Sequence, residues 1–137
     1  MVGVVKRYME RQTEIFDLMC RLGVTANYIG FFYMAYAVQL CMEQPERLSL
    51  VTKWVYPDVA KRYKTNWRAV ERDIRTVGCV IWAHNRPLLE SLAQGPLPRK
   101  PCTSQLLAIL SHSLLSSSAP LRPAVRAEPL SKSAVEI

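Results

Sequence analysis

Hydrophobic residues recur at helical spacing through most of the chain. Near the N-terminus, apolar side chains three and four positions apart share one face of a helix; they are Ile15, Leu18, Met19 and Leu22. The pattern predicts a first helix over residues 5–22, which Gly23 is suited to end. No segment alternates apolar and polar residues for long enough to indicate a strand. We therefore predict an all-α fold.

The second predicted helix is apolar on almost every side. It carries the run at residues 28–42, and either Thr25 or Asn27 can cap it. A helix without a polar face is expected at the centre of a domain. The run is shorter than the roughly 20 residues of a membrane span, so we expect no membrane partner. Pro45 begins a third helix, with expected inward residues Leu48, Val51, Thr52 and Val55.

A short helix, a polar turn and a longer helix follow from Pro57 onward. The turn covers residues 64–66, and Thr65 or Asn66 can cap the longer helix, which we predict over residues 66–84. This order is typical of a helix-turn-helix. A last short turn through residue 92 completes a predicted compact bundle of about six helices. The side chains expected in its core include Val59, Ala60, Tyr63, Trp54 and Trp82.

The longer helix has two opposite faces. At about 100° per residue, one face gathers the apolar residues Val70, Ile74, Val77 and Ile81. The opposite face carries arginines, whose planar fork can bind guanine O6 and N7 or clamp a phosphate. Glu71, at the edge of this face, can accept a hydrogen bond from cytosine N4. The candidate base-reading residues are Arg68, Glu71, Arg72 and Arg75. A charged outer face is also typical of a helix that is merely solvated.

Charge supports a polyanionic partner. The net charge is +7, which favours nucleic acid or an anionic membrane surface. Residues 53–86 hold eight basic and three acidic residues, so much of the excess lies around the predicted motif. Trp67 can either stack on the sugar-phosphate or cover the edge of the domain. The candidate phosphate-contacting residues are Lys53, Lys61, Arg62, Lys64, Asn66 and Trp67.

Signals for catalysis and for metal binding are weak. The four cysteines, Cys20, Cys41, Cys79 and Cys102, lack the close pairing of zinc sites. The carboxylates are scattered, and no glycine-rich phosphate loop is present. We therefore expect no enzymatic activity, no metal and no cofactor, and we interpret the cysteines as reduced, buried thiols.

Composition changes near Gly95. Six of the nine prolines follow it, and proline interrupts helices. We predict a helical DNA-binding domain over residues 1–94 and a Pro/Ser-rich, mostly disordered tail over residues 95–137. Residues 104–115 could form a helix, for which the sequence indicates no packing partner.

Two segments resemble a known family. The sequence VTKWVYPDVAKRY at residues 51–63, followed by VERDIR at residues 70–75, resembles the C-terminal effector domain of the sporulation stage-zero response regulator. The resemblance covers roughly residues 12–93. It implies a six-helix domain that binds a short promoter element, often as a tandem dimer, and activates or represses transcription.

The resemblance also implies roles for single residues. Glu71, Arg72 and Arg75 match the base- and phosphate-contacting residues of the family, while Lys61 and Arg62 match its basic first helix. The segment after Trp82 corresponds to the one that helps contact the RNA polymerase sigma factor. The chain departs from the family pattern at Trp67, Ala69 and Thr76.

We therefore expect a sequence-specific transcriptional regulator that binds double-stranded DNA, with a second copy on tandem sites and the sigma factor as further partners. We expect it to be cytoplasmic and associated with the nucleoid. Only about 11–20 residues precede the resemblance, too few for a receiver domain. The alternative is a non-catalytic interaction module that keeps the fold but binds a related regulator or the transcription machinery.

Overall fold

The computed structural model describes the backbone of residues 2–117 and the side chains of residues 9–116. Within that part of the chain every regular element is a helix, which confirms the predicted all-α class. The elements are α1 (Val2–Arg21), α2 (Ile29–Glu43), the 3-10 helix η1 (Pro45–Ser49), α3 (Val51–Trp54), α4 (Tyr56–Arg62), α5 (Trp67–Ala93) and α6 (Thr103–Ser117).

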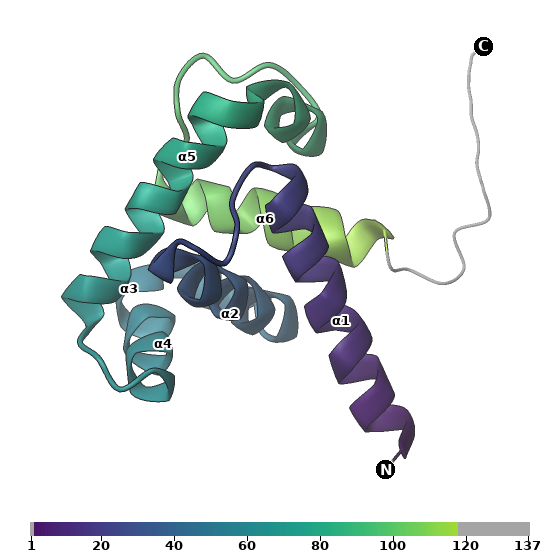
Figure 1. The fold of residues 1–137 in the computed structure, drawn as a ribbon, viewed down its shortest axis with the longest axis vertical. Helices are drawn as coiled ribbons and strands as arrows, with labels where there is room; N and C mark the ends of the chain where they lie inside the picture. The colour runs from purple at the N-terminus through teal and green to yellow at the C-terminus, as the bar shows by residue number, and fades with distance from the viewer. Residues whose placement is uncertain (1, 118–137) are drawn as a thin grey trace.

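Helix α2 is the centre of the fold, as its all-round apolar pattern predicts. It contacts α1, α4, α5, α6 and η1, and Figure 1 shows other helices on several sides of it. Its N-cap is Tyr28, which makes no side-chain capping bond. The prediction that Thr25 or Asn27 caps it is therefore wrong, because residues 25–28 form a turn in which the Tyr28 N–H donates to the Thr25 carbonyl, at 3.1 Å.

Gly30 brings α2 close to α5. A Cβ at this position would overlap the backbone oxygen of Asp73 and lie 2.7 Å from the Val77 side chain. The two helices therefore meet almost backbone to backbone at this crossing, with no room for a larger residue. At the other end of the preceding loop, Gly23 has a φ of +101° and ends α1 as predicted.

The predicted third helix is divided into η1 and α3. Val51 and Val55 are buried and Leu48 is partly buried, but Thr52 is exposed and Trp54 is 48% exposed. The inward position predicted for Thr52 and the core position predicted for Trp54 are wrong, because a 3-10 turn shifts the helical phase that the prediction assumed. Trp82, by contrast, packs partly buried against the core. Tyr63 is 37% exposed, so its predicted core position is also wrong; its ring packs at a tilt against Tyr33, with centroids 5.3 Å apart.

Helix α6 corrects the predicted domain boundary. It packs on α2, α5 and η1, and its buried side chains include Leu106, Leu107, Leu110 and Leu114. The prediction that this segment has no partner is wrong, and residues 103–117 belong to the helical fold rather than to a tail starting at residue 95. The prolines before α6 shape a connection instead of ending the fold. Residues 118–137 lie outside the described part of the chain.

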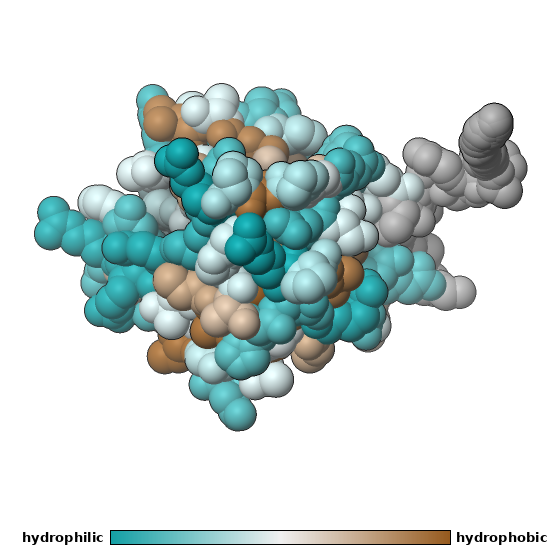
Figure 2. Space-filling model, turned by 90° about the horizontal axis from the view of Figure 1, so that it is seen from above, coloured by the Kyte–Doolittle hydropathy of each residue, from teal (hydrophilic) through white to brown (hydrophobic). Residues whose placement is uncertain are grey.

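The surface of the bundle is mixed. Seen from above the view of Figure 1, hydrophilic residues cover most of the face and hydrophobic residues emerge in separate patches (Figure 2). Among the described residues, no helix combines the length and the apolar character needed to cross a membrane.

Candidate nucleic-acid interface

The turn between α4 and α5 is closed by two backbone hydrogen bonds. The Thr65 N–H donates to the Ala60 carbonyl at 2.9 Å, and the Lys64 N–H donates to the Lys61 carbonyl at 3.4 Å. This is the Schellman arrangement, which needs a residue in the left-handed region. Lys64 occupies that position with a φ of +56°, where glycine is more usual. The turn is thus defined by its backbone, and it leaves the Lys64 side chain exposed.

Asn66 begins α5. Its Oδ1 accepts a hydrogen bond from the Ala69 N–H at 2.9 Å, so Asn66, and not Thr65, is the cap. Trp67 follows as the first helical residue and is 40% exposed. The predicted start of the longer helix is confirmed.

Helix α5 continues past residue 84, where its predicted end lies, and bends there. Asn85 has a non-helical φ of −149° and ψ of 57° within the helix, and Pro87 follows. Proline cannot donate a backbone hydrogen bond and disturbs the preceding turn. The Asn85 Oδ1 accepts from the Leu88 N–H at 3.2 Å, as an N-cap does. The last short turn predicted through residue 92 is therefore the second segment of one bent helix.

The two faces of α5 are as the sequence predicts. Val70, Ile74, Val77 and Ile81 are all completely buried. Arg68, Arg72 and Arg75 are exposed on the opposite side, and the side chains of Arg72 and Arg75 are 68% and 58% exposed. A buried stripe holds the helix to the bundle while the arginine face, defined by Arg68, Arg72 and Arg75, meets solvent.

The arginine face carries weak internal ion pairs. Arg72 Nε lies 3.2 Å from Asp73 Oδ1, and Arg75 Nη2 lies 4.0 Å from Glu71 Oε1. Both arginine side chains are more than half exposed, and ion pairs at the surface contribute little to stability. An incoming phosphate or base edge can therefore compete for these guanidinium groups at small cost. Arg68 stacks over the Trp67 ring, with its guanidinium carbon 5.5 Å from the centroid.

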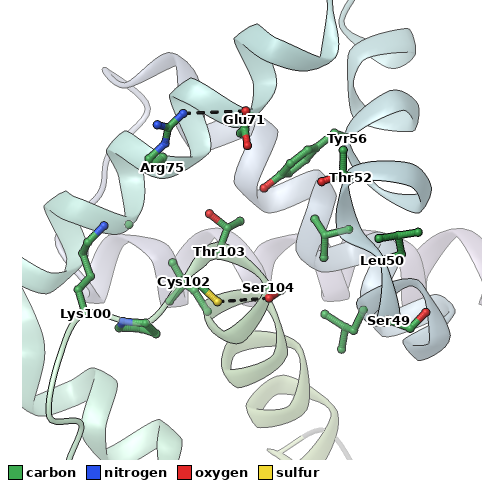
Figure 3. Close-up of a pocket in the computed structure, with 15 residues that line it drawn as sticks. Ser49, Leu50, Thr52, Tyr56, Glu71, Arg75, Lys100, Cys102, Thr103 and Ser104 are labelled. Carbon is green, nitrogen blue, oxygen red and sulfur yellow. Dashed lines mark hydrogen bonds and ion pairs between the residues drawn. The ribbon is translucent and has the colours of Figure 1, made fainter.

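The candidate base-reading residues fall into two groups. Glu71 and Arg75 line a pocket of about 600 Å³ between η1, α3, α5 and the start of α6, whereas Arg68 and Arg72 do not. Figure 3 shows Tyr56 on the far side of this pocket, beside Thr52. Burial raises the pKa of Tyr56, an effect that its hydrogen bond with Thr103 partly offsets.

The candidate phosphate-contacting residues surround the motif unevenly. Lys53, Lys61 and Lys64 are exposed, and Lys53 Nζ lies 5.1 Å from the centroid of the Trp54 ring. Arg62 instead lies against aromatic rings, with its guanidinium carbon 4.9 Å from the Tyr36 centroid on α2. The Arg62 side chain is thus packed against the surface of the protein.

Sequence reasoning missed two cations near the motif. Arg47 donates to the Trp54 carbonyl and to Asp58 Oδ2, the latter at 2.6 Å, and so joins η1 to the start of α4. Lys100 approaches α5 from the segment before α6, where its Nζ lies 3.4 Å from Cys79 Sγ. Lys100 escaped notice because it fell within the predicted tail. The apolar spacing after Pro101 was the available signal that this segment is anchored.

Comparison with known families agrees with this geometry. The family model described as sporulation initiation factor Spo0A C terminal matches residues 15–114. The chain belongs to this family. The match runs from α1 well into α6, and so it includes the helix that composition alone assigned to a tail. The family is a DNA-binding regulatory domain of sporulation.

Proposed function

We propose that this chain is a sequence-specific transcriptional regulator that inserts the first half of α5 into the major groove of promoter DNA. The observation that carries the proposal is the arginine face, exposed directly opposite a completely buried apolar stripe. A helix held in this way presents its outward side chains in fixed positions, which is what the reading of base edges requires.

The three arginines and Glu71 would contact different parts of the DNA. Arg72 lies at the centre of the arginine face and would reach deepest into the groove, where its fork can bind guanine O6 and N7. Arg68 would contact bases or phosphates nearer the start of the helix. Arg75 and Glu71 share one flank, where their charged groups lie 4.0 Å apart, and Glu71 would accept a hydrogen bond from cytosine N4.

Phosphate contacts would come from the elements around the reading helix. In this motif the helix before the turn crosses the DNA backbone, which gives α4 and the turn the task of neutralising phosphates. Lys61 and Lys64 are exposed there, and Lys53 is exposed on α3. Asn66 and Trp67 stand at the N-terminus of α5, an end that attracts phosphate. Arg62 would contribute while it remains stacked on Tyr36.

Membership of the family supports a proposal about protein partners. We propose a second copy of the chain on tandem DNA sites and the RNA polymerase sigma factor as partners during transcription. Binding to promoters would bring the protein to the nucleoid.

The test is selection of bound duplexes from a random DNA pool, followed by titrations at several salt concentrations. A defined motif should emerge, bound more tightly than scrambled DNA. Arg72→Ala should cost roughly 1–3 kcal/mol on the selected site and relax the preference at one base pair. Lys61→Ala should weaken both DNAs equally. Absence of any salt-dependent DNA binding, together with co-purification of a protein partner, would support an interaction module instead.

A further inference from the structure

The segment between α5 and α6 is fixed at its middle. Leu97 is held from both sides of its peptide: its N–H donates to Glu90 Oε2 at 2.8 Å, and its carbonyl accepts from Arg86 Nη2 at 2.7 Å. Arg86 and Glu90 also pair with each other, at 3.2 Å. The hydrogen bond from Leu97 lowers the pKa of Glu90, which keeps this carboxylate charged. The segment therefore leaves α5 along a defined path.

The same segment then presents two cations. Arg99 and Lys100 are exposed, and they lie between Pro98 and the buried Pro101. Proline fixes its own φ and restricts the residue before it. With Leu97 anchored on one side and Pro101 buried on the other, Arg99 and Lys100 have limited freedom to move away from α5.

Lys100 extends the arginine face of α5. Its Nζ lies 3.4 Å from Sγ of Cys79, an exposed residue one turn beyond Arg75. At about 100° per residue, Cys79 falls on the same side of the helix as Arg72 and Arg75. Figure 3 shows Lys100 reaching along α5 on the side that carries Arg75. Lys100 thus places a positive charge beside Cys79, at a position of this helix face where α5 itself has no basic side chain.

We propose that Lys100 contacts a DNA phosphate at the edge of the groove that α5 enters; this rests on the proposed function. Cys79 is seven residues beyond Arg72, about 10 Å along a helix that rises 1.5 Å per residue. The major groove is about 12 Å wide. With Arg72 at the base edges, the surface around Cys79 therefore reaches the sugar-phosphate backbone. A thiol is a weak acceptor, so Lys100 can exchange it for a phosphate oxygen.

This role differs from that of the reading arginines. Lysine carries a compact charge without the planar fork, so Lys100 adds affinity for any sequence and no preference among bases. Each phosphate that a protein neutralises changes the slope of log K against log salt by about 0.9. Lys100 should therefore appear in the salt dependence and leave the selected motif unchanged.

The experiment compares Lys100→Ala with Arg21→Ala in the full chain. Both variants remove one positive charge, and Arg21 is 58% exposed at the end of α1. Binding of the selected and the scrambled duplex is titrated at several salt concentrations, with thermal melting as the check on folding. Lys100→Ala should reduce the slope by about 0.9 on both DNAs, Lys100→Arg should restore it, and Arg21→Ala should leave it unchanged.

Three results would overturn the inference. A slope for Lys100→Ala equal to that of Arg21→Ala would remove Lys100 from the interface while DNA binding by the chain stands. A changed base preference in Lys100→Ala would make Lys100 a base contact rather than a phosphate contact. A wild-type chain that binds no DNA at any salt concentration would remove the proposed function and this inference together.

Discussion

Asn85 ties the bend of α5 to the end of α1. Its side-chain amide donates to the Arg21 carbonyl at 2.8 Å, across 64 positions of sequence, while its Oδ1 caps the second segment of α5. One side chain therefore serves a carbonyl at the end of one helix and an N–H freed by the bend in another. Because α5 carries the arginine face, this contact helps to set its position relative to α1.

The double role of Asn85 can be separated by substitution. Asn85→Ala removes both hydrogen bonds and should destabilise the fold by about 0.5–2 kcal/mol, the range for a lost cap. Asn85→Asp keeps the capping oxygen and loses only the donor to Arg21, so it should fall between wild type and Asn85→Ala. Urea unfolding measures the three free energies. Equal stability of all three proteins would mean that the bend needs neither bond.

Arg72→Lys separates the fork of arginine from its charge. Lysine keeps the positive charge but cannot make the bidentate contact. The variant should lose about 1–3 kcal/mol of discrimination at one base pair while its salt slope stays that of wild type. Fluorescence anisotropy on the selected site and its single-base variants gives both quantities, with Arg21→Lys as the control. Unchanged discrimination would reduce Arg72 to a phosphate contact.

The inclusion of α6 in the fold predicts a large effect at Leu107, which is completely buried. Leu107→Ala should cost about 2–5 kcal/mol, as other buried leucine truncations do. Leu50→Ala is the matched control, because Leu50 is 50% exposed, and it should change stability by less than about 0.5 kcal/mol. Chemical denaturation measures both. A loss of stability at Leu107 as small as that at Leu50 would mean that α6 does not belong to the folded core.

Glu90 should make the segment before α6 sensitive to acid. The pKa of Glu90 is lowered in the fold, chiefly by the hydrogen bond from the Leu97 N–H. Such a carboxylate adds stability above its ordinary value of 4.5, and that contribution is lost as the pH falls through the lowered folded value. Exchange of the Leu97 amide should therefore quicken, relative to the core of α5, as the pH falls below about 4.5. Glu90→Gln should remove this dependence, and its persistence in that variant would locate the acid effect elsewhere.

The prediction that the cysteines are buried holds for Cys41 and is wrong for Cys20, Cys79 and Cys102, which are exposed. The four thiols should therefore differ in reactivity. Burial raises the pKa of Cys41 to about 11, while the hydrogen bond with Ser104 lowers the pKa of the exposed Cys102. The thiolate is the reactive form, so maleimide at pH 7 should label Cys102 first and Cys41 last. Peptide mass spectrometry gives the order.

Added DNA should protect Cys79 from maleimide and leave the labelling of Cys20, on α1, unaffected. Equal protection of both cysteines would contradict the placement of Cys79 beside the DNA.

The long helix was predictable because its signal is local. Val70, Ile74, Val77 and Ile81 repeat at the period of an ideal α-helix, so the buried face follows from spacing alone. The candidate caps Thr65 and Asn66 are adjacent, so the start of α5 was predicted to within one residue, and the structure selects Asn66. Trp54 and Thr52 were misplaced because η1 has a different period from the one assumed. Pro87 indicates from the sequence that the helix is disturbed near Asn85. The hydrogen bond from Asn85 to Arg21 could not be predicted, because the two residues are far apart in sequence.

The candidate site was predictable only in part for the same reason. Exposure of Arg68, Arg72 and Arg75 follows from the phase of one helix. The neighbourhood of Lys100 depends on α6 docking, and the three prolines at 96, 98 and 101 favoured disorder when considered as composition alone. Proline restricts the chain in a folded connection as much as it prevents a helix, and only the buried partner surface decides between the two outcomes.

The close crossing at Gly30 has a consequence for how such a domain can change its target. Because α2 and α5 touch with no space for an added Cβ, the angle at which these two helices cross is constrained by their main chains. Exchange of core side chains elsewhere in the bundle leaves this contact between main chains in place. If the chain reads DNA as we propose, replacement of outward residues such as Arg68 and Arg72 could change the preferred operator while this crossing stays undisturbed.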